Sequence, residues 1–199
     1  MYYPMYGIDA TYLLVLLGVV LCMGASAKMN STFNRYSRVR SASGLTGCEA
    51  AYRVLQSAGI YDVRVEHVGG NLTDHYDPRN KALRLSDATF NSTSVAAIGV
   101  EAHECGHAMQ HAQGYAPLKL RSTLVPVANF GSQIAWPLIL IGLVLGGSSL
   151  LNLGIIAFSM AVLFQLVTLP VEFNASKRAI NTLYKTEILD PTETAAAKK

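Results

Sequence analysis

The apolar positions of this 199-residue chain are concentrated in two long runs. Residues 10–27 contain no charged side chain, and neither do the 37 residues of 134–170. A membrane-spanning helix needs about 20 apolar residues, so the first run predicts one crossing and the second run predicts two. The glycines and serines at 146–149 are the natural place for the second run to turn back. The pattern therefore predicts an α-helical membrane protein.

Two segments between the apolar runs have the sequence signals of helices. Thr46 and Glu49 have the spacing of a capping box, which predicts a helix that begins at Thr46 and ends at Gly59. A second helix of small and aliphatic residues should begin after the polar residues 91–94 and stop at Gly114. A helix with so few polar side chains is predicted to be buried.

Three short segments between these helices have the pattern of strands. Residues 63–68 alternate apolar and polar side chains, as a half-buried strand does. Residues 72–77 and 82–85 flank a Pro-Arg-Asn turn, which predicts a hairpin or two short strands. We expect residues 83–85 to form the edge of this sheet, where an extended peptide could pair with it.

The positive charges indicate how the chain is oriented in the membrane. All 16 lysines and arginines lie within residues 28–121 or 177–199. By the positive-inside rule these two regions share the cytoplasmic side, while the N-terminus and the turn near residue 147 face outward. The lack of basic residues before Lys28 favours an uncleaved anchor over an export signal. The net charge of +3 suits an anionic membrane surface and is too small to indicate nucleic-acid binding.

The second predicted helix contains an HExxH motif at residues 103–107. A spacing of four residues is close to one helical turn, so His103 and His107 project from one face and can bind a single Zn²⁺ ion through their imidazole nitrogens. Glu104 lies beside them and could accept a proton from a zinc-activated water. A buried cluster of these three residues would be costly without a metal ion. The motif therefore predicts a zinc metallopeptidase.

Catalytic zinc needs a third protein ligand, and two residues are candidates. His111 follows His107 by four residues, but eight residues of helix separate it from His103 by roughly 12 Å, which is too far for one ion. Glu172 is the better candidate. It directly follows the second apolar run, where a carboxylate needs a partner or a position at the membrane surface, and the topology places it on the same side as the motif.

A non-catalytic role for the motif is the alternative interpretation. Zinc can close a structural site when a fourth protein ligand replaces water, and Cys105 or His111 could supply that ligand in a membrane scaffold or regulator. Cys105 points away from the metal face of the helix, so we expect it to be a packing residue. The three scattered cysteines have no paired spacing, which fits a reducing compartment.

Several segments in the same order resemble the YugP-like neutral zinc metallopeptidases of bacterial membranes. The resemblance extends from about residue 32 to the end of the chain, and its motifs are Asp74-His75-Tyr76-Asp77-Pro78, Ala102-His103-Glu104-Cys105-Gly106-His107-Ala108, residues 111–118 and residues 169–176. Residues 172–176 are also similar to the Glu-x-x-Ala-Asp segment of HtpX-like proteases. This implies a gluzincin site with Glu172 as third zinc ligand, although Ser176 stands where those enzymes have an acidic residue.

These observations predict four parts of the chain: a transmembrane anchor (1–27), a small α+β zincin-like cytoplasmic domain with a short sheet before the HExxH helix (28–133), a transmembrane hairpin (134–170), and a cytoplasmic segment with the third ligand (171–199). His75 and Tyr76 are candidate donors to the oxyanion of the reaction, and a turn stabilised by Asx hydrogen bonds is the alternative for that segment.

The predicted activity is a zinc-dependent endopeptidase in the inner membrane of a bacterial cell, with a multi-pass topology and a cytoplasmic active site. We expect peptide or membrane-protein substrates, in quality control or processing. A homo-oligomer or a regulatory membrane partner is an open alternative, because Gly142 and Gly146 have the spacing of a close helix contact.

Overall fold

The computed structural model describes residues 10–198, so residues 1–9 of the predicted anchor and Lys199 of the predicted tail lie outside the described part. Six helices and three strands make up this part. They are α1 (Ala10–Tyr36), α2 (Gly47–Ser57), β1 (Arg64–His67), β2 (His75–Asp77), β3 (Ala82–Leu85), α3 (Val95–Ala112), α4 (Ala116–Leu145), α5 (Ser148–Thr186) and α6 (Pro191–Ala197).

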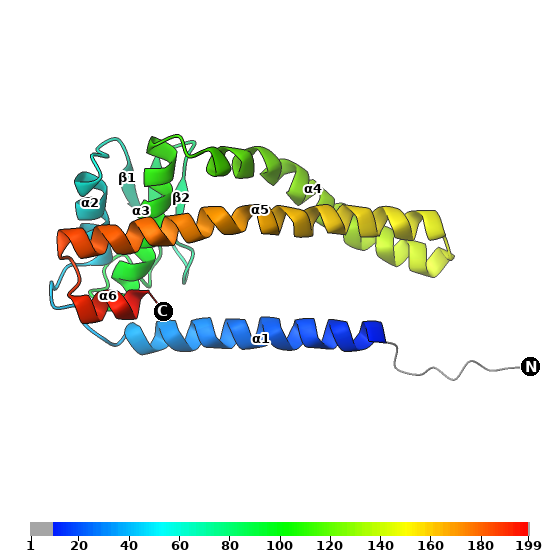
Figure 1. The fold of residues 1–199 in the computed structure, drawn as a ribbon, viewed down its shortest axis with the longest axis horizontal. Coiled ribbons are helices and arrows are strands. Elements are labelled where there is room, and N and C mark those ends of the chain that lie inside the picture. The colour runs from blue at the N-terminus through cyan, green and yellow to red at the C-terminus, as the bar shows by residue number, and fades with distance from the viewer. Residues whose placement is uncertain (1–9, 199) are drawn as a thin grey trace, which may run out of the picture.

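Three helices are long and apolar enough to cross a membrane, as the hydrophobic pattern predicts. They are α1, α4 and α5, and they extend in the same direction from a small unit that contains the sheet, α2, α3 and α6 (Figure 1). Helix α1 continues beyond the apolar run to Tyr36, because residues 28–36 contain neither glycine nor proline to stop it.

Helices α4 and α5 form the predicted hairpin. The chain turns at Gly146, which has a left-handed backbone with φ 65° that suits glycine. Gly142 allows the close approach of the two helices, since a Cβ there would lie 2.6 Å from the backbone nitrogen of Leu151. Gly142 therefore packs within the hairpin, while Gly146 forms the turn.

Both helices of the hairpin extend further than the apolar run. Helix α4 begins at Ala116 and passes through Pro126 and Pro137, and α5 passes through Pro170. A proline removes one helical hydrogen bond and commonly kinks a helix, but packing against a neighbouring helix can hold the helix together. The proposed boundaries after residues 133 and 170 therefore fall inside continuous helices.

The sheet has the order β1-β3-β2, with β1 parallel and β2 antiparallel to β3. The prediction that residues 83–85 form the edge is wrong, because β3 is the central strand. Leu83 and Leu85 are completely buried, and they need neighbours on both sides of the strand. The edge strand that faces the motif helix is β2 instead, and it contacts α3.

One apolar core joins the small unit to the end of α5. Its largest fully buried side chains include Leu55 of α2, Leu83 of β3, Ile98 of α3 and Leu183 of α5. Helix α3 crosses the middle of this core and begins at Ser94, whose side chain caps the helix as predicted. The core therefore fixes α3 and α5 against each other, and they are the helices that carry the two parts of the predicted metal site.

Candidate metal centre

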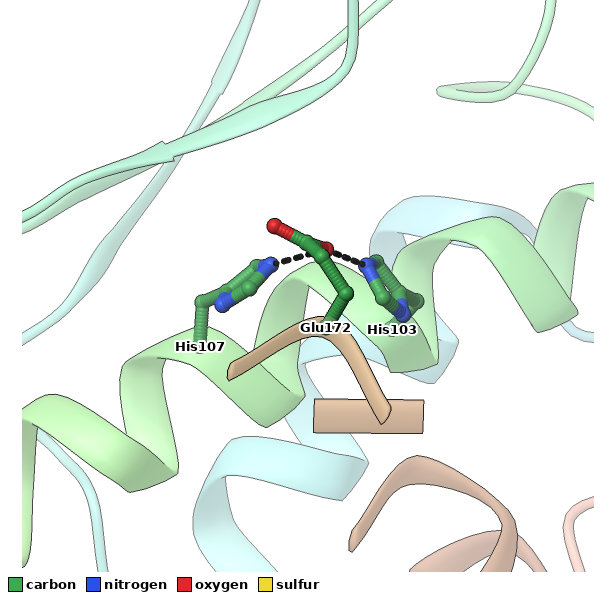
Figure 2. Close-up of side chains that lie close together, drawn as sticks. All are labelled: His103, His107 and Glu172. Carbon is green, nitrogen blue, oxygen red and sulfur yellow. Dashed lines mark hydrogen bonds and ion pairs between the residues drawn. The ribbon is translucent and has the colours of Figure 1, made fainter. Parts of the chain in front are cut away.

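His103, His107 and Glu172 lie together where α3 crosses α5. Their ligand atoms are all within 4.8 Å of one another. Oε2 of Glu172 is 3.2 Å from Nε2 of His103 and 3.3 Å from Nε2 of His107 (Figure 2). The structure thus brings together the three residues predicted as zinc ligands, although they are 69 positions apart in the sequence at the widest.

The outer nitrogen of each imidazole is held by a second side chain. His103 Nδ1 and the hydroxyl group of Ser176 form a hydrogen bond of 3.0 Å. When His103 Nδ1 donates in this bond, Nε2 of the neutral imidazole is the nitrogen that can bind a metal ion.

The side chain of Gln110 holds the outer nitrogen of His107 in a similar way. Its amide nitrogen donates to the carbonyl oxygen of Val171 at 2.8 Å and to Oδ1 of Asn174 at 3.1 Å. Because these two acceptors fix the orientation of the amide, its oxygen faces Nδ1 of His107 at 3.1 Å and can only accept. In the neutral imidazole, Nε2 of His107 is therefore the nitrogen that can bind a metal ion.

This donor set fits a zinc ion. Two imidazole nitrogens and one carboxylate oxygen converge on one point, and all three are Lewis bases that a shared cation satisfies. Burial opposes the protonated form of His107, but the nearby Glu172 and Glu104 outweigh burial and raise the pKa of the imidazole. The same negative field that favours a proton favours a metal cation.

We expect the Gln110→Ala variant to bind zinc about 10- to 100-fold more weakly than the wild type. The substitution removes the acceptor that orients His107 and leaves the carbonyl group of Val171 without this donor. Competition with a chromophoric chelator measures the affinity. Gln56→Ala, at an exposed position on α2, is the matched control. Equal zinc affinities for both variants would show that Gln110 does not orient the ligand.

Glu104 lies in the same cavity, which has a volume of about 410 Å³ and is lined by β2, α3, α4 and α5. Its Oε2 accepts the backbone N–H of Tyr76 at 3.1 Å. Burial raises the pKa of Glu104, and the two histidines only partly offset this. The edge strand β2 thus positions the carboxylate beside the ligand cluster, through its backbone and not through a side chain.

The other sequence candidates are placed around this cavity. His75 and Tyr76 line the cavity from β2, and the side chain of each already forms a hydrogen bond. His75 Nδ1 is 2.8 Å from the carbonyl oxygen of Thr73. The Tyr76 hydroxyl is 2.8 Å from Nδ1 of His111. His111 is therefore a partner of Tyr76 outside the ligand cluster, as its distance along the helix predicts. Cys105 is buried against the carbonyl oxygen of Ala51, which confirms it as a packing residue.

Two residues at this site, Gln110 and Arg121, lie outside the motifs from which the sequence predicts the metal centre. Gln110 is one helical turn beyond His107, and its position at i+3 on the same face was the available clue. Arg121 is the last basic residue before the uncharged run, and its Nη1 lies 3.0 Å from Oε1 of Glu172. Sequence reasoning used Arg121 only as a marker of topology.

A buried carboxyl group lies one turn before the motif. Glu101 is fully buried on α3, and neither of its oxygens has a hydrogen bond of ordinary geometry to another described residue. Asp74 and Thr89 are near enough to influence it, but desolvation dominates and raises the pKa of Glu101 to about 9. Burial of Glu101 therefore favours the neutral carboxyl group in the folded protein.

The Glu101→Gln variant should be more stable than the wild type above pH 5. The unfolded chain releases the Glu101 proton near pH 4.5, whereas the folded protein keeps it until about pH 9, so wild-type stability falls as the pH rises between these values. Glutamine cannot ionise, which predicts a gain of about 2–3 kcal/mol at pH 7 that disappears below pH 4.5. Thermal unfolding at pH 5 and pH 8 measures it, with exposed Glu187→Gln as control. A gain that does not grow with pH would contradict the argument.

Comparison with known proteins agrees with this geometry. The model of a family described as "Putative neutral zinc metallopeptidase" matches residues 11–199, and the chain belongs to this family. The "Putative membrane protease YugP" of Bacillus subtilis (strain 168) is 51% identical over 166 residues, which cover 83% of this chain and 74% of that protein. The resemblance to the YugP-like family is therefore confirmed. No solved structure matches the chain.

Proposed function

We propose that this protein is a membrane-embedded zinc metalloendopeptidase of the gluzincin type. The observation that carries the proposal is the convergence of His103, His107 and Glu172, with Glu104 in the same cavity. The short sheet that precedes the HExxH helix is compatible with a zincin-like domain, and the family and the membrane protease to which the chain is similar also support the proposal.

His103, His107 and Glu172 would hold the ion, which would polarise the substrate carbonyl and acidify water. Glu104 accepts the proton that the attacking water loses as its oxygen bonds to the carbonyl carbon. Glu104 then gives this proton to the amide nitrogen as the C–N bond breaks, which leaves an amine and a carboxylic acid that keeps the second proton of the water. The bond from the Tyr76 N–H holds one oxygen of Glu104 and leaves the other free for the proton.

The second candidate function is a scaffold or regulator with a structural zinc site. That function needs a fourth protein ligand, and neither Cys105 nor His111 reaches the cluster. Within residues 10–198, the three-residue cluster has an open side toward the cavity, which favours a site that admits water and substrate.

The cellular setting follows from the positive charges and the three apolar helices. The site would face the cytoplasm at the inner membrane of a bacterial cell, within reach of membrane proteins and their juxtamembrane segments. We propose processing or quality control of such proteins as the role. A second copy of the chain or a regulatory membrane protein is a further candidate partner.

The proposal is tested on the full chain in detergent, with zinc content and casein hydrolysis as the measurements. We expect about one zinc per chain, loss of hydrolysis on removal of the metal with a chelator, and recovery when zinc is added back. Glu172→Ala should lose zinc, while His111→Ala should keep it. Zinc loss in His111→Ala alone would refute the ligand set and favour the structural site.

A further inference from the structure

Arg121 reaches the candidate metal centre from α4. Its Nη1 lies 3.0 Å from Oε1 of Glu172, and about a third of its side chain is exposed. Oε2 of this carboxylate faces the two histidines (Figure 2), so Arg121 and the histidines contact different oxygens of Glu172. Because both oxygens belong to one carboxylate, Arg121 is bonded to a side chain that is an expected metal ligand.

Arg121 also lines the cavity in which a substrate would bind. Helix α4 supplies one wall of this cavity, and β2 supplies another with His75 and Tyr76. Within the described part of the chain, Arg121 is the lining residue with a fixed positive charge. A guanidinium group has several N–H donors in one plane, so the bond to Glu172 leaves donors for a ligand.

His75 and Tyr76, the two candidate oxyanion donors on β2, are less suited than Arg121 to stabilise negative charge. The Tyr76 hydroxyl is already bonded to His111, and burial raises the pKa of Tyr76 to about 12. His75 is exposed, and its Nδ1 is bonded to the carbonyl oxygen of Thr73. A hydrogen bond from a charged donor is roughly twice as strong as one from a neutral donor.

We propose that Arg121 is a catalytic residue that donates hydrogen bonds to the carbonyl oxygen of the scissile peptide. It would stabilise the negative charge that develops on this oxygen when water adds to the carbonyl carbon, and the charge disappears when the C–N bond breaks. The inference rests on the proposed peptidase function and assigns the oxyanion role that the sequence left to His75 and Tyr76. Removal of one such donor typically lowers kcat by about 100- to 1000-fold.

A purely structural role for Arg121 predicts a different result. If the guanidinium group only balanced the charge of Glu172, its removal would weaken zinc binding, and activity would fall in proportion to zinc content. An oxyanion donor instead lowers kcat while zinc occupancy and KM stay nearly constant, because it acts in the transition state.

The experiment compares Arg121→Met and Arg121→Lys in the full chain, with labelled casein as substrate. We expect full zinc occupancy in both variants, KM within about threefold of the wild type, and kcat lowered about 100-fold in Arg121→Met. Lysine keeps the charge near Glu172 without the planar group and should recover only part of the loss. Added guanidinium ion should partly restore Arg121→Met.

Lys119→Gln is the matched control, because it removes a positive charge two residues away on α4 from a side chain that does not line the cavity. Its kcat should equal that of the wild type. Unchanged kcat in Arg121→Met, or a parallel loss of zinc and activity that Arg121→Lys fully restores, would overturn the inference and leave the proposed function standing. A zinc-loaded wild type that cleaves no casein would instead refute the proposed function, and this inference with it.

Discussion

The Glu104→Gln variant is expected to hold zinc like the wild type and to hydrolyse casein about a thousandfold more slowly. Glu104 is not part of the cluster of His103, His107 and Glu172, so its replacement leaves the ligand set intact. The amide oxygen of glutamine can still accept the N–H of Tyr76, which keeps the side chain in place. The variant loses only the ability to take up a proton at this position.

Zinc content and the initial rate of hydrolysis, measured on the same preparation, separate these effects. The exposed Glu187→Gln substitution removes one carboxylate far from the cavity and should change neither quantity. Hydrolysis by Glu104→Gln at the wild-type rate would show that another group accepts the proton. Loss of both zinc and activity would show that Glu104 helps to hold the metal.

The parts of the fold that the sequence predicted depend on neighbouring residues. The Thr46–Glu49 capping box, the Ser94 cap and the turn at Gly146 all act within a few positions of the chain, so short patterns identify them. The spacing of His103 and His107 is likewise a property of a single helix turn. Glu172 was predicted although it is distant in sequence, because a carboxylate at the end of an apolar run needs a partner.

The parts that the sequence did not predict depend on contacts between distant segments. Strand order is one of them: the turn between residues 72–77 and 82–85 predicts two short strands but does not show that β3 lies between β1 and β2. Helix length is another, because the uncharged run of residues 134–170 does not show that α4 and α5 continue beyond it as single helices. The ion pair between Arg121 and Glu172 is a third, because it forms only when α4 and α5 pack together.

The second variant with a large expected effect is Gly106→Ala, within the HExxH motif. A Cβ at Gly106 would lie 2.4 Å from the carbonyl oxygen of Ala175 on α5, well inside van der Waals contact. The helices must therefore separate by about 1 Å, and overpacking of this kind typically costs about 1–3 kcal/mol. Because Glu172 is one turn before Ala175, the same movement takes it away from the histidines.

We expect Gly106→Ala to unfold at a clearly lower temperature and to bind zinc at least tenfold more weakly, as measured by thermal unfolding in detergent and by chelator competition. Gly99→Ala is the matched control on the same helix, since the nearest atom to its Cβ would be the Cβ of Ala197 at 3.3 Å. Alanine also favours the helix over glycine, so a simple gain in helix propensity would stabilise both variants. Wild-type stability and zinc affinity in Gly106→Ala would show that the spacing of α3 and α5 does not set the geometry of the metal centre.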